Sequence, residues 1–303
     1  MMDLSRLLTP GIRRDGLWFA ALALLVAATS ASADTARQLD ATIAVEHDDN
    51  VTFGGRSRDA LRDTAGQLRL DYRQLHALDP DRAWGFTTAV DTRQYAEYSR
   101  LGEVQLEAGP VWRQRFGRGF YAPLLELSLT AARIESRSDL RTGNRWTAAG
   151  TLRRRMTDRI MGQVGLHHSQ RRASDSDAFD QDRTGLFVHA DYLLRAHRTL
   201  YGVLAWQTGD VAVTADLGYA GDSAYGGGAQ GEADDAFGGE ADDRFAFAVE
   251  ADLASLVVGY NHGFNRRNAI DTSIRATRGS VSGGPDYDRV VLRIAYLYRF
   301  DLR

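Results

Sequence analysis

The chain has 303 residues, of which 37 are basic and 40 acidic, so its net charge is -3, and it contains no cysteine. The lack of cysteine excludes a disulfide framework and a thiolate metal site. The sequence has no phosphate-binding loop, zinc spacing or nucleic-acid motif. We therefore expect no cofactor, no metal and no nucleic-acid partner.

The first 33 residues have the pattern of a secretory signal peptide. Arginines precede an apolar run from Leu17 to Ala28, and the small-residue cleavage site Ala31-Ser32-Ala33 follows it. The run of about 12 residues is too short to cross a bilayer. We expect residues 1–33 to be cleaved and residues 34–303 to form one domain.

From Asp34 onward, short runs alternate between apolar and polar residues, the pattern of β-strands with one apolar face. In one of the clearest runs, Leu68, Leu70 and Tyr72 alternate with polar or charged residues. Twelve such runs lie near residues 39–46, 67–73, 84–93, 103–113, 125–130, 145–153, 163–169, 186–192, 199–208, 244–264, 270–277 and 287–300. Pro110 interrupts the fourth run and predicts a bulge or an early strand end.

The connections between these runs alternate between short and mostly longer ones. Short turns are expected at 78–82, 117–119, 157–159, 196–199 and 265–268, and longer loops at 48–63, 95–100, 135–143, 173–182, 209–243 and 279–286. This alternation is typical of outer-membrane barrels, with short periplasmic turns and longer outer loops. The fold class is therefore an all-β, single antiparallel transmembrane β-barrel of about 12 strands; a soluble sandwich is the alternative. The mean hydropathy of -0.35 is compatible with a barrel, because half of each strand faces a polar lumen.

The last strand has an aromatic end that is typical of a barrel-closing strand. Its apolar register ends in Tyr296, Tyr298 and Phe300, and aromatic residues gather where barrel strands meet lipid headgroups. We expect these three residues to form the membrane-insertion signal, although Asp301-Leu302-Arg303 follows them.

The longest loop, residues 209–243, is rich in glycine and acidic residues. Residues 199–243 contain nine acidic residues and no arginine. The chain after residue 33 has 34 arginines and 38 acids, a net charge of -4, and without residues 199–243 it has 34 arginines and 29 acids, or +5. The composition favours a solvated, mobile hairpin. A plug folded into the lumen is the alternative.

The polar register of the strands supplies candidate lumen-lining residues with both signs of charge. They could line a small polar pore or form arginine–carboxylate ladders that fill the lumen. The candidates are Arg69, Asp71, Arg73, Asp91, Arg93, Glu103, Glu107, Arg113, Glu126, Arg153, Asp191, Asp271, Arg275 and Arg293.

His167 and Ser169 have the spacing of a histidine–serine pair used by outer-membrane phospholipases. A serine nucleophile needs a base within reach and a third group that orients the base. His167 and Ser169 share the polar register, which should face the lumen and not the lipid. The sequence therefore predicts no catalytic residues and no enzyme.

Several short motifs suggest a resemblance to known barrels. They are Asp48-Asp49-Asn50 after the first strand, Phe179-Asp180-Gln181 before a later strand, and the ending Tyr296-Leu297-Tyr298-Arg299-Phe300. On these motifs the chain resembles proteobacterial porin-like outer-membrane β-barrels, including the barrel portion of surface-lipoprotein assembly modifiers. The resemblance to the modifiers implies an export role that would need a separate periplasmic partner.

Three functions follow from this sequence. The first is a passive channel for small polar solutes, and the second is a structural or export-assisting barrel with an occluded lumen. An enzyme acting on outer-membrane lipid ranks third. We expect the protein in the outer membrane of a Gram-negative bacterium, in contact with lipid and lipopolysaccharide and inserted by the barrel-assembly machinery. The sequence leaves the solute and the oligomeric state open.

Overall fold

The computed structural model describes residues 35–216, 231–237 and 244–302. The expected signal peptide, residues 1–33, lies outside the described residues. The strands are β1 Thr35–Asp48, β2 Asp63–Ala77, β3 Arg82–Tyr95, β4 Glu103–Arg115, β5 Leu124–Ser136, β6 Gly143–Arg155, β7 Ile160–Ala173, β8 Gln181–Arg195, β9 Arg198–Asp216, β10 Glu232–Ala233, β11 Arg244–Gly263, β12 Asn268–Val281 and β13 Tyr287–Phe300.

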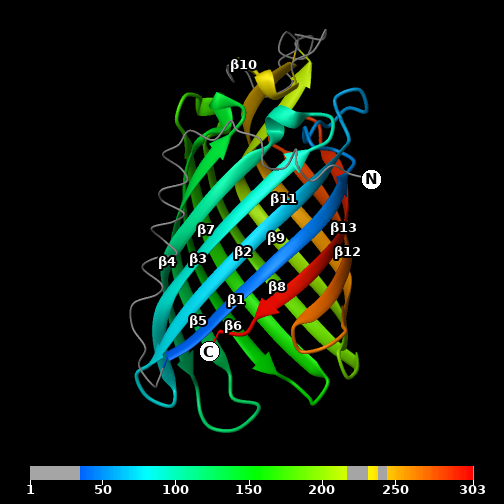
Figure 1. Ribbon diagram of the computed structural model, residues 1–303. Coiled ribbons are helices and arrows are strands. Elements are labelled where there is room, and N and C mark those ends of the chain that lie inside the picture. The colour runs from blue at the N-terminus through cyan, green and yellow to red at the C-terminus, as the bar shows by residue number, and fades with distance from the viewer. Residues whose placement is uncertain (1–34, 217–230, 238–243, 303) are drawn as a thin grey trace.

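Twelve of the described strands close into one antiparallel barrel (Figure 1). Each strand pairs with the next along the chain, β9 pairs with β11, and β13 closes the sheet on β1. In the closing pair, Val45 lies opposite Ile294 and Leu39 opposite Phe300. The two-residue strand β10 pairs with β11 outside this ring. The sequence prediction of an all-β barrel with twelve strands is confirmed.

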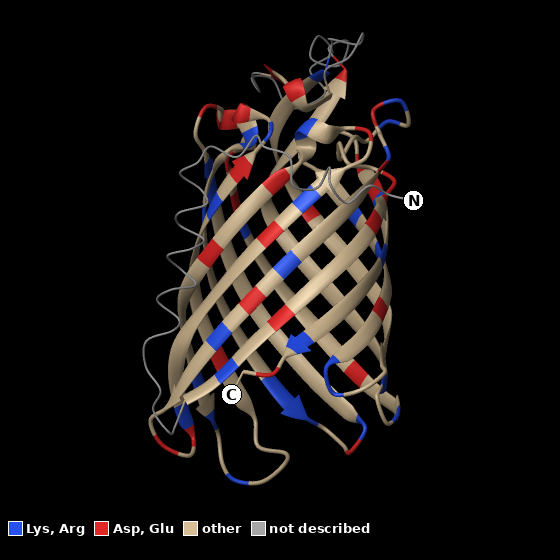
Figure 2. Ribbon diagram, viewed as in Figure 1, with Lys and Arg blue, Asp and Glu red and all other residues tan. Residues whose placement is uncertain are grey.

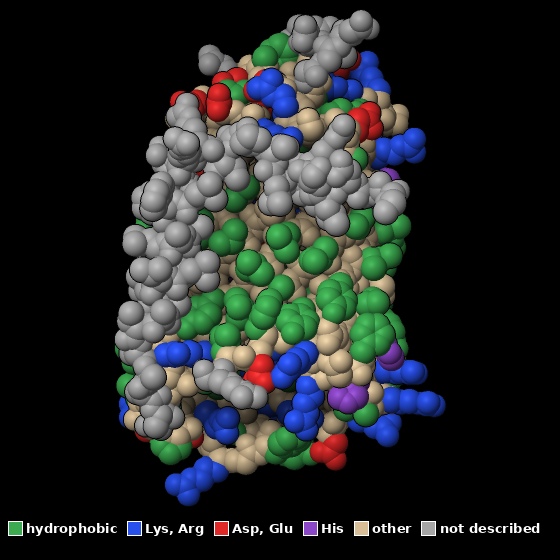
Figure 3. Space-filling model, viewed as in Figure 1, with side chains coloured by type: hydrophobic (Ala, Val, Ile, Leu, Met, Phe, Trp, Pro, Cys, Tyr) green, Lys and Arg blue, Asp and Glu red, His purple; other side chains and the backbone are tan. Residues whose placement is uncertain are grey.

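The barrel is apolar outside and polar inside. Ile294 is 63% exposed and Leu166 65% exposed on the outer face, whereas Ala295, the inward neighbour of Ile294, is 1% exposed. A belt of hydrophobic side chains surrounds the middle of the visible face, and charged groups gather above and below it (Figure 3). An apolar surface of this extent is unfavourable in water and is typical of a lipid-facing barrel.

The two ends of the barrel differ in their connections. One end, here the short-turn end, has the connections 78–81, 116–123, 156–159, 196–197 and 264–267; the long-loop end has 49–62, 96–102, 137–142, 174–180, 217–243 and 282–286. The connection 116–123 is longer than the turn expected at 117–119. Its Tyr121 hydroxyl donates a hydrogen bond of 2.7 Å to Asp158 of the neighbouring turn, so this loop docks on its neighbour.

The hairpin of β9 and β11 extends beyond the barrel rim at the long-loop end (Figure 1). The sequence prediction of a loop from residue 209 is therefore wrong for residues 209–216, which are strand. The apolar residues change faces along each strand: Leu204 and Trp206 are exposed outside, whereas Val211 and Val213 are buried inside. The apolar residues change faces because the outer face of each strand meets lipid in the barrel, whereas the inner face meets packed loops at the long-loop end.

Pro110 neither ends nor shifts its strand. Strand β4 continues to Arg115, and its register with β5 is the same on both sides of the proline, with Ala108 opposite Ala131 and Val111 opposite Ser128. The expected bulge or early end is wrong, because the neighbouring ladder bonds hold the register when one donor is missing.

The described loops contain four 3₁₀ turns: η2 Ser99–Leu101, η3 Asp139–Arg141, η4 Asp177–Phe179 and η6 Asp235–Phe237. Within the described ranges, no helix is both long and apolar enough to cross a membrane. The four turns all lie at the long-loop end.

Candidate functional site: the lumen

The wall formed by β13 and β1 to β5 holds a network of ion pairs. Charged residues recur along the strands through the height of the barrel (Figure 2). Glu46 of β1 is shared by two guanidinium groups, with Arg93 at 3.0 Å and Arg293 at 3.1 Å. Glu126 of β5 is likewise shared by Arg113 at 2.6 Å and Arg73 at 3.2 Å.

Other members of the expected lumen set also form ion pairs. Arg69 pairs with Asp71 at 2.7 Å and Asp91 at 3.5 Å. The second contact of Arg293 is to Asp271 at 3.7 Å. Several of these pairs pass over intervening strands, as Arg73 of β2 does when it reaches Glu126 of β5.

Three expected lumen residues have no ion pair among the described residues. These residues are Glu103, Arg153 and Arg275. Asp191 accepts a hydrogen bond of 2.9 Å from His189, and Glu107 pairs with Arg145 at 3.3 Å. The structure thus brings most of the expected set into pairs and leaves two arginines and one glutamate without a counterion.

Further charged residues on the inward register lie outside the expected lumen set. Arg289 contacts Asp48 through its Nε, at 3.0 Å from each carboxylate oxygen. The alternation predicted the face of these residues but not their partners, because pairing depends on how the sheet closes. These further residues include Asp40, Glu46, Asp48, Arg145, Arg171, Arg183, Arg289 and Arg299.

On the wall from β7 to β13, aromatic rings lie flat over glycines. A Cβ on Gly259 would lie 2.1 Å from the ring of Tyr201, and one on Gly279 would lie 2.3 Å from the ring of Tyr287. His167 covers Gly185 in the same way, at 2.4 Å. A glycine under each ring lets the ring pack against the sheet instead of projecting into the lumen.

Two open cavities occupy the short-turn half of the lumen. Their volumes are about 560 Å³ and 440 Å³. Asn261 borders both, Arg73 and Arg299 line the larger, and Asp191 and Asp271 line the smaller. The lumen near the short turns therefore holds two open cavities lined by both charged and uncharged side chains.

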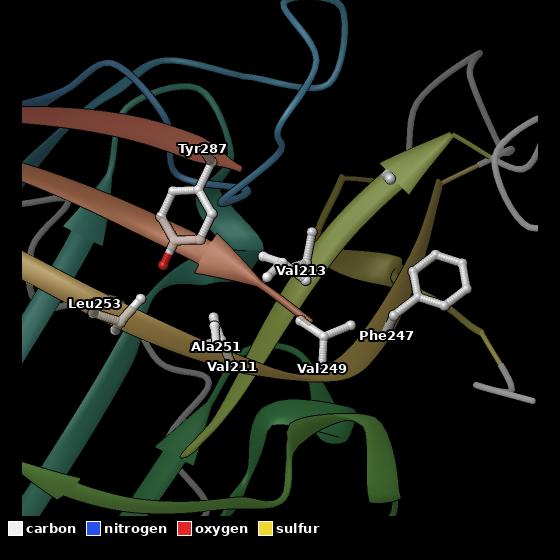
Figure 4. Packing of buried hydrophobic residues seen from close by; sticks show 9 residues of the cluster. Val211, Val213, Phe247, Val249, Ala251, Leu253 and Tyr287 are labelled. Carbon is white, nitrogen blue, oxygen red and sulfur yellow. The ribbon is translucent and has the colours of Figure 1, made fainter. Parts of the chain in front are cut away.

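Apolar side chains of strands and loops pack together at the long-loop end, and this packing is here named the apolar cap. Its largest cluster joins Val211 and Val213 of β9, Phe247 and Val249 of β11, and Tyr287 of β13, all at most 5% exposed. Figure 4 shows Tyr287, Val213 and Val249 of this cluster, which come from three different strands. Smaller clusters in the loops complete the cap around Leu101, Phe179 and Phe237.

The acidic segment 231–237 is part of this cap. Phe237 is 5% exposed and packs with Val51 and Leu101. Asp234 pairs with Arg141 at 2.5 Å and accepts a hydrogen bond of 2.6 Å from Thr214. The expectation of a solvated hairpin is wrong for these residues, because Phe237 and Asp234 are buried among the loops. The rest of the expected loop, residues 217–230 and 238–243, lies outside the described residues.

The cap also contains Tyr98, a loop tyrosine whose hydroxyl has a raised pKa. The ring of Tyr98 lies 5.0 Å from that of Phe237. Burial raises the pKa of the Tyr98 hydroxyl, and the Glu97 carboxylate raises it further. Tyr98 therefore remains neutral over a wider pH range and can pack in the cap.

His167 and Ser169 do not form a catalytic pair in this structure. The His167 Nε2 lies 3.2 Å from Gln207, and the Ser169 hydroxyl accepts a bond of 3.3 Å from Thr147. Neither of these side chains is joined to a carboxylate by a hydrogen bond or ion pair among the described residues. The arrangement lacks the oriented base that a serine nucleophile needs.

The aromatic residues of the closing strand lie on the outer face near the short-turn end. Tyr296 is 42% exposed and Phe300 is 39% exposed. The rings of Tyr298 and Phe300 meet edge to face at 4.8 Å. This is the position at which a barrel strand would contact lipid headgroups.

No group of three or more His, Asp or Glu side chains within the described ranges is placed to hold a metal ion.

No family model matches the chain, and no curated protein sequence matches it. Solved structures do match it. An outer-membrane channel from Pseudomonas putida F1 is 13% identical, with a TM-score of 0.56, and the match covers 90% of this chain and all of the other.

Two porins match with lower scores. The KdgM porin, solved in complex with disordered oligogalacturonate, has 11% identity and a TM-score of 0.47, covering 86% of this chain and 99% of the porin. The NanC porin has 9% identity and a TM-score of 0.47, covering 87% and 100%. The likeness is one of fold. The chain has the fold of an outer-membrane β-barrel.

Proposed function

We propose that this protein is a passive outer-membrane channel for small polar solutes. The observation that supports the proposal most is the combination of an apolar outer belt with a polar, open half-lumen. The belt places the barrel in lipid, and cavities of about 560 Å³ and 440 Å³ lead inward from the short-turn end. Barrels of twelve strands fall between the filled eight-stranded kind and the open sixteen-stranded porins.

The location and partners follow from the same surfaces. The belt would contact lipid and lipopolysaccharide, and the barrel-assembly machinery would insert the chain. In the usual orientation the short turns face the periplasm and the long loops face outward. Strand β1 starts at Thr35 and strand β13 ends at Phe300, both on the short-turn side.

Liposome swelling tests the channel directly. Purified protein in liposomes should admit small neutral sugars, at rates that fall steeply as the sugar becomes larger. Heat-denatured protein is the control. Swelling no faster than in protein-free liposomes would reject the channel.

A second function, a structural or export-assisting barrel with an occluded lumen, is favoured by one observation. The apolar cap buries Phe247 and Val213 to 1% and 0% exposure, so the long-loop end is densely packed. The resemblance to the barrel of surface-lipoprotein assembly modifiers belongs to this hypothesis. It predicts no swelling with any solute and a periplasmic protein that co-purifies with the barrel. A lipid-acting enzyme is not proposed.

A further inference from the structure

Three inward-facing arginines of the lumen form no ion pair among the described residues. Among the described residues, Arg171, Arg183 and Arg275 have no carboxylate within 4.0 Å. Arg171 donates to the carbonyl oxygen of Arg141, and Arg183 donates to that of Asp210 at 2.6 Å. Arg275 has neither a hydrogen bond nor an ion pair in the described part of the chain, and its side chain is exposed to the lumen.

These three arginines belong to a larger group, here named the arginine cluster. The electrostatic neighbours of Arg275 are Glu46 and three arginines. Those of Arg171 and Arg183 likewise combine one carboxylate, Glu103 or Asp210, with several arginines. Arg289 is a neighbour of both Arg183 and Arg275 and so links them. The cluster consists of Arg93, Arg145, Arg171, Arg183, Arg275, Arg289 and Arg293.

Nearby carboxylates are almost all engaged elsewhere. Glu46, Asp48, Glu107 and Asp271 form ion pairs with other members of the cluster. The carboxylate of Asp210 accepts the backbone N–H of Asp182 at 3.1 Å. Glu103 and Asp210 form no ion pair within the described ranges. Three guanidinium groups that form no ion pair therefore face two such carboxylates, which leaves an excess of positive charge.

Two buried polar atoms in the same region have no partner. The hydroxyl of Tyr287 makes no hydrogen bond, although this residue is 2% exposed. The Nε of Arg171 is also buried without a partner. Arg183 and Arg289 are the charged neighbours of Tyr287, so its free hydroxyl lies among the cluster. Buried polar groups without partners are rare and costly, and a ligand would satisfy them.

The cluster lies where a solute would pass. On β12, Asp271 borders the smaller cavity and Arg275 follows four residues later, about 13 Å along the strand. Tyr287 belongs to the apolar cap. The cluster therefore stands between the open cavities and the cap, within reach of molecules that enter from the short-turn end.

We propose that the arginine cluster and the Tyr287 hydroxyl form a binding site for a small solute with two or more oxyanion groups, either carboxylates or phosphates. The planar guanidinium fork matches both groups with two parallel hydrogen bonds. Several such forks at different heights favour a solute with more than one anionic group. This proposal rests on the channel function, because it names the class of solute that the channel would admit.

Equilibrium binding tests the site without requiring conductance. Citrate and inorganic phosphate are titrated into the full-length protein in detergent, with sucrose as the neutral control, and the heat of binding is measured. We expect saturable binding of citrate or phosphate and none of sucrose. Tighter binding of citrate would identify carboxylates as the preferred group, and tighter binding of phosphate would identify phosphates.

Matched variants locate the site. Arg275→Gln should weaken binding about 10- to 100-fold, the effect of losing a charge-assisted hydrogen-bonded pair. Arg153→Gln is the control, because Arg153 also faces inward without an ion pair but lies near the short turns. Heat-modifiable gel mobility checks folding. Tyr287→Phe, which removes only the hydroxyl, should weaken binding several-fold.

The outcomes separate this site from the channel itself. Absence of citrate and phosphate binding, or equal binding by Arg275→Gln and the unaltered protein, would overturn the site. If liposomes still swell with neutral sugars, the channel stands without it. Binding that depends on Arg275 in a protein that gives no swelling would support the site and reject the channel.

Discussion

The change Phe237→Ala should open the acidic segment 231–237 without unfolding the barrel. Phe237 is 5% exposed and packs between Val51, Leu101 and Tyr98. Truncation of a buried phenylalanine to alanine costs about 3–5 kcal/mol. We take about 3 kcal/mol, because loops relax around a cavity better than a sheet does. That loss would raise the population of the opened segment about 100-fold, at about 1.4 kcal/mol for each factor of ten.

Hydrogen exchange measured by mass spectrometry can follow this opening. The Asp234 amide donates to the carbonyl of Arg244 at 2.9 Å, and the Phe237 amide donates to that of Asp234 at 3.3 Å. Exchange at these two amides should become about 100 times faster, while exchange in β1 and β13 stays unchanged. Phe120→Ala is the control, because Phe120 is 64% exposed at the short-turn end.

Two results would refute this reasoning. Unchanged exchange at both amides would mean that Phe237 does not hold the segment. Faster exchange in β1 and β13 as well would mean that the segment is not a separate unit and that the cap supports the barrel. If only the two amides of the segment exchange faster, solute entry into liposomes can be compared between Phe237→Ala and the unaltered protein. That comparison tests whether the segment blocks the lumen.

Two further predictions concern the assembly of the barrel and the width of its lumen. The double change Tyr298→Ala and Phe300→Ala should strongly reduce the heat-modifiable folded form in outer membranes, because both rings anchor the closing strand; unchanged amounts would show that the insertion signal lies elsewhere. Gly259→Ala should displace the ring of Tyr201, which lies 2.1 Å from the position of the new Cβ. The displaced ring would narrow the lumen and slow sugar entry. Gly202→Ala is the control and should leave sugar entry unchanged, because the nearest atom to its new Cβ lies at 3.8 Å.

The barrel itself could be predicted from the sequence because period-two alternation is a local property. Each strand shows its own two faces, and twelve such runs with alternating connections specify the architecture. The prediction failed where the surroundings change along one strand. In β9, the apolar residues change from the outer to the inner face between Trp206 and Val211. When the alternation is assumed to keep one phase along the whole strand, this change looks like the end of the strand.

The lumen was harder to predict than the fold. Alternation places Arg93 and Arg293 on the inward face, but only closure of β13 on β1 brings Arg293 to Glu46, which Arg93 also contacts. The buried acidic segment was missed for a similar reason. Glycine and acidic residues favour solvation, and the two apolar residues Ala236 and Phe237 are too short a run to predict packing against distant loops.

Single-channel recording with introduced cysteines tests most directly whether the inward face lines a conducting path. The chain has no cysteine, so each substitution supplies one reactive thiol. With Ser255→Cys, whose side chain faces inward and bonds to Thr277 at 2.8 Å, a charged methanethiosulfonate reagent should reduce the current in steps. With Ile294→Cys, 63% exposed on the outer belt, the current should not change. Conductance that is absent, or that responds equally to both thiols, would contradict the channel.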